Sequence, residues 1–249
     1  MEFPYHIQFP PILSNNLSQD EAYFYLYQNG DKHTVRFHDY HTIYSLPGLY
    51  EQVFYERLQC RSPQQLATML NTAVQQDHQS TTTLRVLDLA AGNGLMGETL
   101  KKQGVSRLVG VDILPEARTA TIRDRPNVYN EYYVWDFNQL TAKQHEELSN
   151  WHFNCLTCVS ALGFGDIPVS VFMTALNLLS IPAWIAFNIK EDFLQSKDKT
   201  GFSQLVRNLI FSNVFRLHHI ERYCHRLSIE GKPLYYFAIV GQKLDSIKV

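Results

Sequence analysis

The chain has 249 residues, of which 45% are hydrophobic and 18% charged, and its formal net charge is −2. This composition is typical of a globular protein, and the length suits one large domain or one domain with an appended cap. Because nucleic acids and acidic lipids usually require a basic face, we expect neither a nucleic acid nor a membrane as a partner.

Cysteine usage and apolar segments indicate the compartment. Four cysteines are scattered through a chain too large to need disulfides, which is typical of a reducing compartment. The N-terminal segment lacks the basic and apolar regions of a secretory signal. The most apolar stretch, residues 169–187, is interrupted by polar residues and Pro182, which predicts a buried helix, a turn and a buried strand rather than a membrane span. We therefore expect a cytoplasmic protein.

The first 80 residues predict a cap made of a β-hairpin and two helices. Residues 1–20 look irregular. Two runs rich in aromatic and β-branched residues, 22–28 and 32–38, flank Asn29-Gly30-Asp31, a strong hairpin signal. Apolar residues at helical spacing then predict a helix over 48–60 and a second helix that begins with Ser62 as its N-cap.

From residue 81 onward, strands and helices alternate. The predicted strands are 84–89, 107–111, 129–135, 153–162 and 184–189. The predicted helices are 95–103, 115–123, 142–150, 169–179 and 201–212. This alternation indicates a parallel sheet with both faces covered by helices.

The C-terminal section breaks the alternation. Residues 223–228 and 234–240 both resemble strands, but only five residues join them. Because a parallel crossover needs a dozen or more residues, the pair must form an antiparallel hairpin. The predicted fold over residues 81–249 is therefore α/β, a doubly wound Rossmann-like domain whose seven-stranded, mostly parallel sheet has an antiparallel last strand.

A glycine-rich loop follows the first strand of this body. Its spacing is Gly92-x-Gly94-x-x-Gly97, and it opens the helix over 95–103, as in proteins that bind an adenosine cofactor. Asp112 ends the next strand, 112 − 94 = 18 residues beyond Gly94, where an acid can accept hydrogen bonds from ribose hydroxyls.

Two features separate the adenosine cofactors. Asp88 lies just before the glycines and Glu98 in the first helical turn, and both would repel a pyrophosphate. The ammonium and sulfonium of S-adenosylmethionine would instead be attracted by a nearby carboxylate. The antiparallel last strand is also not expected in a dinucleotide fold. We therefore predict S-adenosylmethionine as the cofactor.

Several segments resemble those of class I S-adenosylmethionine-dependent methyltransferases, and they appear in the same order. VLDLAAGNG (86–94) resembles motif I, with Ala90 where that motif often has its first glycine. VGVDI (109–113) resembles the ribose-binding segment, VWDF (134–137) the adenine-binding segment, and LTCVSALGFGDIP (156–168) the motif that faces both cofactor and acceptor. YYFAIVGQ (235–242) resembles the antiparallel seventh strand.

The resemblance covers residues 81–249 and implies the cofactor contacts. These are Asp88, Ala90, Gly92, Asn93, Gly94, Asp112, Ile113, Asp136, Phe137 and Ser160. For Asp136 a helix cap, and for Ser160 a packing role, is the alternative. The stretch from FHDY (37–40) to PGLY (47–50), together with NIKEDF (188–193), resembles an uncharacterised bacterial branch of these enzymes, which implies no substrate.

Residues on the acceptor side are predicted from chemistry and position. His38, Asp39, Tyr40 and His41 are four titratable groups in a row, either a cluster with histidine as base or a polar loop with an Asx turn at Asp39. The residues after strand 184–189 stand where open α/β sheets bind ligands. The predicted catalytic residues are His38, Tyr40 and Glu191. The predicted substrate residues are Tyr44, Tyr50, Asn188 and Lys190.

Cys155-x-x-Cys158 has the spacing of a metal or redox pair. Both cysteines fall inside a predicted strand, where an odd separation directs side chains to opposite faces. No second close pair exists in the sequence. We therefore expect no metal site.

These observations predict a methyltransferase that acts by in-line displacement at the sulfonium methyl. The acceptor is an oxygen or nitrogen of a small molecule, and we expect the aromatic cap to roof its pocket. Alignment of the reactants can supply roughly 7–11 kcal/mol of the barrier reduction. Two alternatives stay open: a nicotinamide-dependent oxidoreductase, and a protein that binds the cofactor without turnover. Neither the acceptor's identity nor the oligomeric state follows from the sequence.

Overall fold

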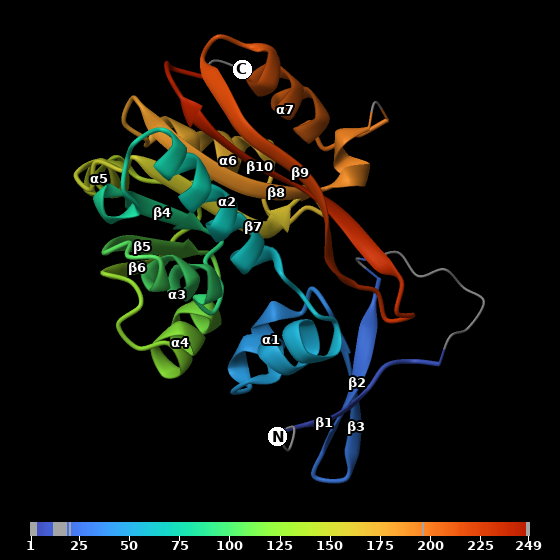
Figure 1. Ribbon diagram of the computed structural model, residues 1–249. Coiled ribbons are helices and arrows are strands. Elements are labelled where there is room, and N and C mark those ends of the chain that lie inside the picture. Colours follow the sequence, from blue (N-terminus) through green and yellow to red (C-terminus); the bar gives the residue numbers. More distant parts are fainter. Residues whose placement is uncertain (1–3, 12–18, 20, 196, 248–249) are drawn as a thin grey trace.

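The computed structural model describes residues 4–11, 19, 21–195 and 197–247. Figure 1 shows a large twisted sheet with helices on both faces, and a smaller three-stranded sheet near the N-terminus. Within the described residues, no helix combines the length and the apolar character needed to cross a bilayer.

The large sheet has seven strands in the order β6-β5-β4-β7-β8-β10-β9. Its strands are β4 (Arg85–Leu89), β5 (Arg107–Asp112), β6 (Glu131–Val134), β7 (Cys155–Leu162), β8 (Ala183–Lys190), β9 (Phe215–Leu227) and β10 (Pro233–Lys243). The strands from β4 to β8 pair in parallel, whereas β10 is antiparallel to both neighbours. The predicted fold class is therefore confirmed.

The β9–β10 hairpin closes as its short connection requires. Ser228 and Lys232 pair through a backbone hydrogen bond of 2.7 Å, and Gly231 turns the chain with a φ of +78°. Strand β9 begins at Phe215, eight residues before the predicted strand. Because β9 is an edge strand, its first half carries exposed polar and charged residues in place of the apolar run that the prediction required.

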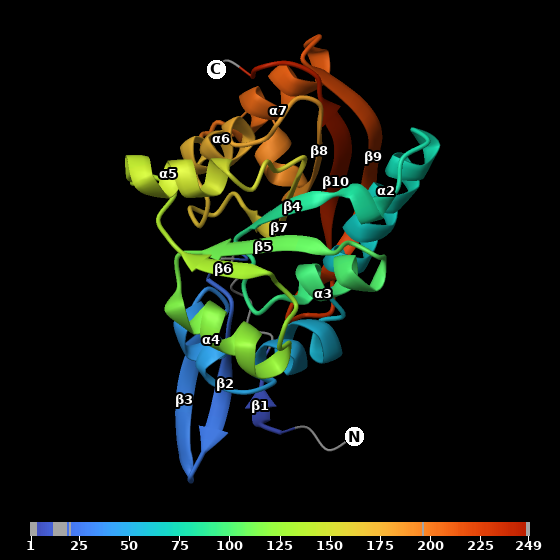
Figure 2. The same cartoon turned by 90° about the vertical axis from the view of Figure 1, so that its left-hand side faces the viewer.

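Helices cover both faces of the large sheet (Figure 2). They are α2 (Ser62–Gln76), α3 (Leu95–Lys102), α4 (Pro115–Asp124), α5 (Ala142–Ser149), α6 (Val169–Asn177) and α7 (Phe202–Phe211). Residues of α5, α6 and α7 share one core cluster with the sheet, and residues of α2 and α3 share another. Cys155 and Cys158 belong to different clusters, as their odd spacing predicts.

Helix α2 packs directly on the large sheet, although the sequence groups it with the cap. Leu66 and Leu70 are fully buried beside Val86 of β4. The prediction of Ser62 as N-cap is wrong by one position, because Arg61 caps the helix without a side-chain bond. Ser62 is buried, and its hydroxyl bonds instead with Tyr223 and His225, at 2.6 Å each. The division at residue 80 stays a prediction.

The remaining N-terminal elements form what we call the N-terminal module. It consists of β1 (His6–Gln8), β2 (Tyr23–Gln28), β3 (Asp31–Arg36), α1 (Tyr40–Ser45) and the π-helix η1 (Glu51–Arg57). The β2–β3 hairpin turns at Asn29 and Gly30, both with positive φ, as the sequence predicts. Strand β1 pairs with β2, which corrects the irregular reading of residues 6–8. Residues 1–3, 12–18 and 20 lie outside the described residues.

Two helical elements of the module differ from prediction. Helix α1 was not predicted, because the polar run at its start hides the buried Ile43 and Tyr44. The helix predicted over 48–60 is present as the shorter π-helix η1. Two 3-10 helices, η2 (Thr81–Thr83) and η3 (Glu191–Leu194), complete the described helices. Helix α1 packs against α4, so the module docks on the edge of the α/β body.

The packing of α2 makes a measurable prediction. Leu70→Ala removes a fully buried side chain from the α2–sheet core and should lower the free energy of unfolding by about 2–5 kcal/mol. Phe211→Ala, at a residue that is 84% exposed on α7, should change it by about 0.5 kcal/mol or less. Urea denaturation of both variants measures this, and equal effects would show that α2 is not part of the core.

Candidate functional site

A cavity of about 320 Å³ lies where the parallel strands of the large sheet end. Asp88 and Leu89 of β4, Asp112 of β5 and Ser160 of β7 line it, together with the segment after β6. Tyrosines of the N-terminal module line another part of its wall. This volume is in the range of small-molecule sites, and the position is where open α/β sheets bind ligands.

The glycine loop is bent by several residues with positive φ. Ala90 has a φ of +55°, Gly92 of +54° and Gly94 of +86°. The left-handed conformation of Ala90 explains why a glycine suits this place in the motif. A side chain at Gly92 would meet the Tyr44 hydroxyl at 2.5 Å, and one at Gly97 would meet the Tyr129 ring at 2.6 Å. Gly92 and Gly97 must therefore be glycine because neighbouring side chains leave no room for a Cβ atom. At Gly94 the left-handed backbone conformation favours glycine.

Asp88 is almost completely buried, with 1% of its surface exposed. Its Oδ2 accepts a hydrogen bond from the Tyr129 hydroxyl and its Oδ1 one from Thr157, both at 2.6 Å. Burial raises the pKa of this carboxyl to about 6, although the two hydrogen bonds oppose the shift. Asp88 forms no ion pair with any described residue, so its charge has no cationic partner in that part of the chain.

Asp112 joins the glycine loop to β5. Its Oδ2 accepts a hydrogen bond from the Gly92 amide at 2.9 Å, and its Oδ1 one from the Leu114 amide at 3.0 Å. Burial raises the pKa of this carboxyl, and the backbone amides lower it in part. The carboxylate is therefore fixed at the cavity wall and adds a second negative charge there.

The other predicted cofactor residues surround these two acids. Ile113 lines the cavity, and 61% of its surface is exposed. Its side chain therefore offers an apolar surface on which a planar ligand group such as adenine could pack. Asp136 accepts a hydrogen bond from the Asn138 amide at 2.8 Å, which makes it part of a turn rather than a helix cap. Phe137 and Asn93 line the cavity and are buried. Gly94 does not line it and serves as the left-handed N-cap of α3.

Three tyrosines of the N-terminal module form a row of neighbouring rings at the cavity, of which Tyr40 and Tyr44 are stacked and Tyr50 is tilted against Tyr44. The ring centroids of Tyr40 and Tyr44 are 5.7 Å apart, and those of Tyr44 and Tyr50 are 5.3 Å apart. All three rings line the cavity, and burial raises the pKa of each hydroxyl above its ordinary value. The tyrosines therefore stay neutral at physiological pH and offer aromatic surface and hydroxyl groups.

His38 pairs with an acid that the sequence analysis did not select. Its Nδ1 lies 3.1 Å from Oδ2 of Asp166, which stands in the loop after β7, and both residues line the cavity. Asp166 belongs to the 156–168 motif, so its place after a strand end is the signal that could have identified it. A carboxylate at this distance can orient an imidazole for proton transfer.

Ser160 and Asn188 form one unit, but only Ser160 faces the cavity. Ser160 has a φ of +61°, and its amide donates to the Asn188 side chain at 2.6 Å. Asn188 is fully buried and donates to the Tyr223 hydroxyl at 2.7 Å. Asn188 therefore holds Ser160 in its left-handed conformation and does not line the cavity.

The structure does not bring Lys190 and Glu191 to the cavity. Glu191 pairs with Arg222 through two hydrogen bonds of 2.7 and 3.3 Å. Lys190 pairs with Asp192 at 2.7 Å. Among the residues that the structure describes, no group of three or more histidine, cysteine, aspartate or glutamate side chains could hold a metal ion.

Comparisons with known proteins point to one fold. No protein-family model matches the chain. A ubiquinone biosynthesis O-methyltransferase of Aliivibrio fischeri is 27% identical over 104 residues, which are 42% of this chain and 43% of that protein. The chain thus matches less than half the length of this curated relative.

Solved structures extend the likeness over most of the chain. Magnesium protoporphyrin IX methyltransferase from Synechocystis, with bound S-adenosylmethionine, is 12% identical, with a TM-score of 0.50 over 73% of this chain and 79% of that one. The N-methyltransferase NodS from Bradyrhizobium japonicum, in complex with S-adenosylhomocysteine, is 11% identical, with a TM-score of 0.51 over 73% and 87%. The chain has the class I methyltransferase fold.

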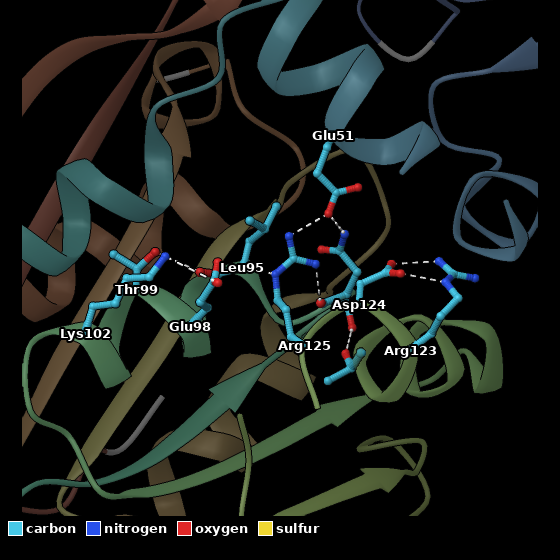
Figure 3. Close-up of polar contacts among 11 residues, drawn as sticks. Glu51, Leu95, Glu98, Thr99, Lys102, Arg123, Asp124 and Arg125 are labelled. Carbon is cyan, nitrogen blue, oxygen red and sulfur yellow. Dashed lines mark hydrogen bonds and ion pairs between the residues drawn. The ribbon is translucent and has the colours of Figure 1, made fainter. Parts of the chain in front are cut away.

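On this methyltransferase fold, the N-terminal module is held against the glycine loop by Glu51. Figure 3 shows Glu51 of η1 pointing toward Arg125, with dashed lines from one of its carboxylate oxygens. Its Oε1 accepts hydrogen bonds from Arg125 at 2.6 Å and from the Asn93 side chain at 2.8 Å. Arg125 also donates to the Asn93 carbonyl at 3.1 Å. No local sequence pattern predicts this contact, because Asn93 and Arg125 are 42 and 74 residues away from Glu51.

This contact predicts a stability difference between two ion pairs of Figure 3. Glu51→Ala leaves the mostly buried Arg125 and the Asn93 amide without their main acceptor, and should lower the free energy of unfolding by about 1–3 kcal/mol. Lys102→Ala breaks the exposed pair with Glu98 and should lower it by about 0.5 kcal/mol or less. Chemical denaturation compares the two variants. Equal losses would mean that Glu51 does not hold the module.

Proposed function

We propose that the chain is an S-adenosylmethionine-dependent methyltransferase that acts on an oxygen or nitrogen of a small-molecule acceptor. One observation carries the proposal: the buried Asp88 and the half-buried Asp112, which form no ion pair with any described residue, flank the glycine loop at the cavity of a class I methyltransferase fold. The methyltransferases that this chain resembles support the same reaction class.

The residues present fit a cationic donor. Asp88 is held only by hydroxyl groups, and Asp112 only by backbone amides, so both keep a full negative charge when ionised. These charges favour an ammonium and a sulfonium and disfavour a diphosphate. When bound, S-adenosylmethionine would supply a methyl group that leaves without acid or metal assistance. Asp88 would attract the positively charged methionine end of this donor. Asp112 would accept hydrogen bonds from its ribose hydroxyls, and Ile113 would pack against its adenine.

His38 and Asp166 would serve the acceptor side. An acceptor hydroxyl must lose its proton as the methyl group arrives, and a neutral imidazole can take that proton. Asp166 orients the His38 ring and would stabilise the imidazolium that results. The ring centroids of Tyr40 and His38 are 5.7 Å apart, and Tyr40 would form part of the wall around the acceptor.

The nicotinamide-dependent alternative is disfavoured by the same electrostatics. A dinucleotide would place its pyrophosphate at the N-terminus of α3, close to Asp88 and to Glu98. The remaining alternative, binding without turnover, predicts cofactor affinity but no methyl transfer. A ligand panel followed by a transfer assay therefore separates the three possibilities.

The first test is calorimetric titration with S-adenosylmethionine, S-adenosylhomocysteine, NAD and NADP. We expect the first two to bind and the two dinucleotides to show no saturable binding. Binding of NAD in preference to S-adenosylmethionine would overturn the proposal.

The raised pKa of Asp88 predicts how this binding depends on pH. Below a pH of about 6 the carboxyl is neutral and loses its attraction for an ammonium, so S-adenosylhomocysteine affinity should fall. Asp88→Asn should bind about tenfold more weakly at pH 7.5 and lose this dependence. Asp31→Asn, the same change at the exposed hairpin tip, is the control. An unchanged affinity of Asp88→Asn would refute the role of Asp88.

The stability of the ligand-free protein should change in the opposite direction. Because the folded-state pKa is raised from 3.8 to about 6, folding favours the protonated form. The stability that this group contributes is fully present below pH 3.8 and is lost as pH rises through 6, by about 3 kcal/mol. The free energy of unfolding of Asp88→Asn and of the unaltered protein is measured at several pH values. The pH-dependent difference between the two proteins isolates the contribution of Asp88.

His38 makes a separate prediction about turnover. With labelled S-adenosylmethionine and a small-molecule extract of cells that carry the protein, His38→Gln should slow product labelling by about 10²–10⁴-fold. Its S-adenosylhomocysteine affinity should stay within about twofold, because His38 contacts the acceptor side. His33→Gln in the exposed β3 strand should match the unaltered protein. Undiminished labelling by His38→Gln would remove it from the mechanism.

A further inference from the structure

A second, smaller pocket adjoins the cavity on the side of β9 and β10. Its volume is about 30 Å³, and Arg226, His225 and Tyr236 line its inner side. We call it the side pocket. His38, Tyr40, Tyr50 and Ser160 line both the side pocket and the cavity. The side pocket is therefore an extension of the cavity next to the proposed base.

The β9–β10 hairpin carries the side pocket against the N-terminal module. Figure 1 shows the lower end of this hairpin beside the small sheet. The Leu227 amide donates to the Leu58 carbonyl at 2.7 Å, and the Arg61 amide donates to the His225 carbonyl at 3.0 Å. These backbone bonds on either side of Arg226 fix the position of its side chain.

Arg226 is a buried cation to which the described residues offer no anionic partner. Only 4% of its surface is exposed, and among the described residues no carboxylate lies within 4.0 Å of its guanidinium. Within the described part of the chain, its side chain donates one hydrogen bond, to the Leu227 carbonyl at 2.8 Å. The guanidinium also lies 5.2 Å from the Phe37 ring centroid. Among the described residues, its five donor hydrogens thus have one side-chain hydrogen-bond acceptor, and a buried charge without a counter-ion is strongly unfavourable.

The neighbours of Arg226 also lack negative charge. Burial and the adjacent guanidinium hold the pKa of His225 well below its ordinary value, so this ring is neutral. Tyr236 is neutral because burial raises the pKa of its hydroxyl. The Ser160 hydroxyl is buried and has no hydrogen-bond partner. The nearby acid, Asp166, is paired with His38.

We propose that the acceptor carries a carboxylate, which Arg226 binds in the side pocket while the atom to be methylated lies near His38. This inference rests on the proposed function and deepens it. A guanidinium pairs with a carboxylate through two parallel hydrogen bonds, and the Ser160 hydroxyl can donate a third. A space of 30 Å³ holds about two water molecules, which corresponds to the two oxygens of a carboxylate. The rings of Tyr40 and Tyr50 then cover the flat body of the acceptor.

Benzoate and its neutral isostere benzamide test the proposal without any substitution. Both are titrated by calorimetry into the protein saturated with S-adenosylhomocysteine. Benzoate should bind about tenfold more tightly than benzamide or better, because only the acid pairs with the guanidinium. Equal binding of the two, or binding of neither, would overturn the proposal.

Substitutions then assign the preference to Arg226. Arg226→Met should remove the preference for benzoate, and Arg226→Lys, which keeps the charge but loses the two parallel hydrogen bonds, should reduce it. Arg216→Met removes a positive charge from an exposed position of the same strand and should leave the preference unchanged. A preference that persists in Arg226→Met contradicts the assignment, and the acid–amide comparison stands even if that variant does not fold.

The test also distinguishes failure of this proposal from failure of the proposed function. S-adenosylhomocysteine affinity is measured first in every variant, and it should be the same in Arg226→Met as in the unaltered protein. If S-adenosylhomocysteine does not bind, the methyltransferase proposal fails, and benzoate is titrated into the protein alone to test Arg226 by itself.

Discussion

The site depends on two carboxylates, the buried Asp88 and the half-buried Asp112, that folding places at the cavity without a cationic partner among the described residues. They stand near the ends of adjacent parallel strands, where Asp88 pairs with Gly110, two residues before Asp112. Hydroxyl and amide donors satisfy their oxygens, but these donors carry no full charge. Burying charge in this way is unfavourable unless a ligand compensates it. The proposed preference for a cationic donor follows from this electrostatic requirement.

The opposite arrangement occurs at the side pocket. Among the described residues, Arg226 is buried without an acidic partner, as Asp88 is buried without a basic one. The cavity and the side pocket therefore differ in the sign of their buried charge, and the neutral Tyr40 and Tyr50 line both. The carboxylates would attract a donor with a cationic end, and Arg226 would attract an acceptor with an anionic end. Each reactant would thus be directed to its own part of the site by long-range electrostatics. Orientation of two reactants in this manner is a large part of what enzymes contribute to a displacement reaction.

The sequence was a good guide to the α/β body and a poor one to the N-terminal module. Alternating apolar strands and the short β9–β10 connection determine the large sheet, because both signals are local. Helix α1 and the length of β9 were missed, since tertiary packing and edge pairing outweigh local hydrophobicity there.

The site divides along the same line. Strand-end acids and the glycine loop could be found by spacing, whereas Asp166, Glu51 and Arg226 reach the site through contacts between distant segments. Lys190 and Glu191 were selected by the correct positional rule, but a surface ion pair occupies each.

The backbone bonds between β9 and the N-terminal module have a consequence for biosynthesis. Leu58 and Arg61 are synthesised before the α/β body, whereas their partners Leu227 and His225 are synthesised after most of it. The aromatic core of the module can collapse while the body is still being translated, but its wall against Arg226 cannot form until β9 has been made. The side pocket is therefore completed later than the core of the module, and a chain that stops before β9 would lack it.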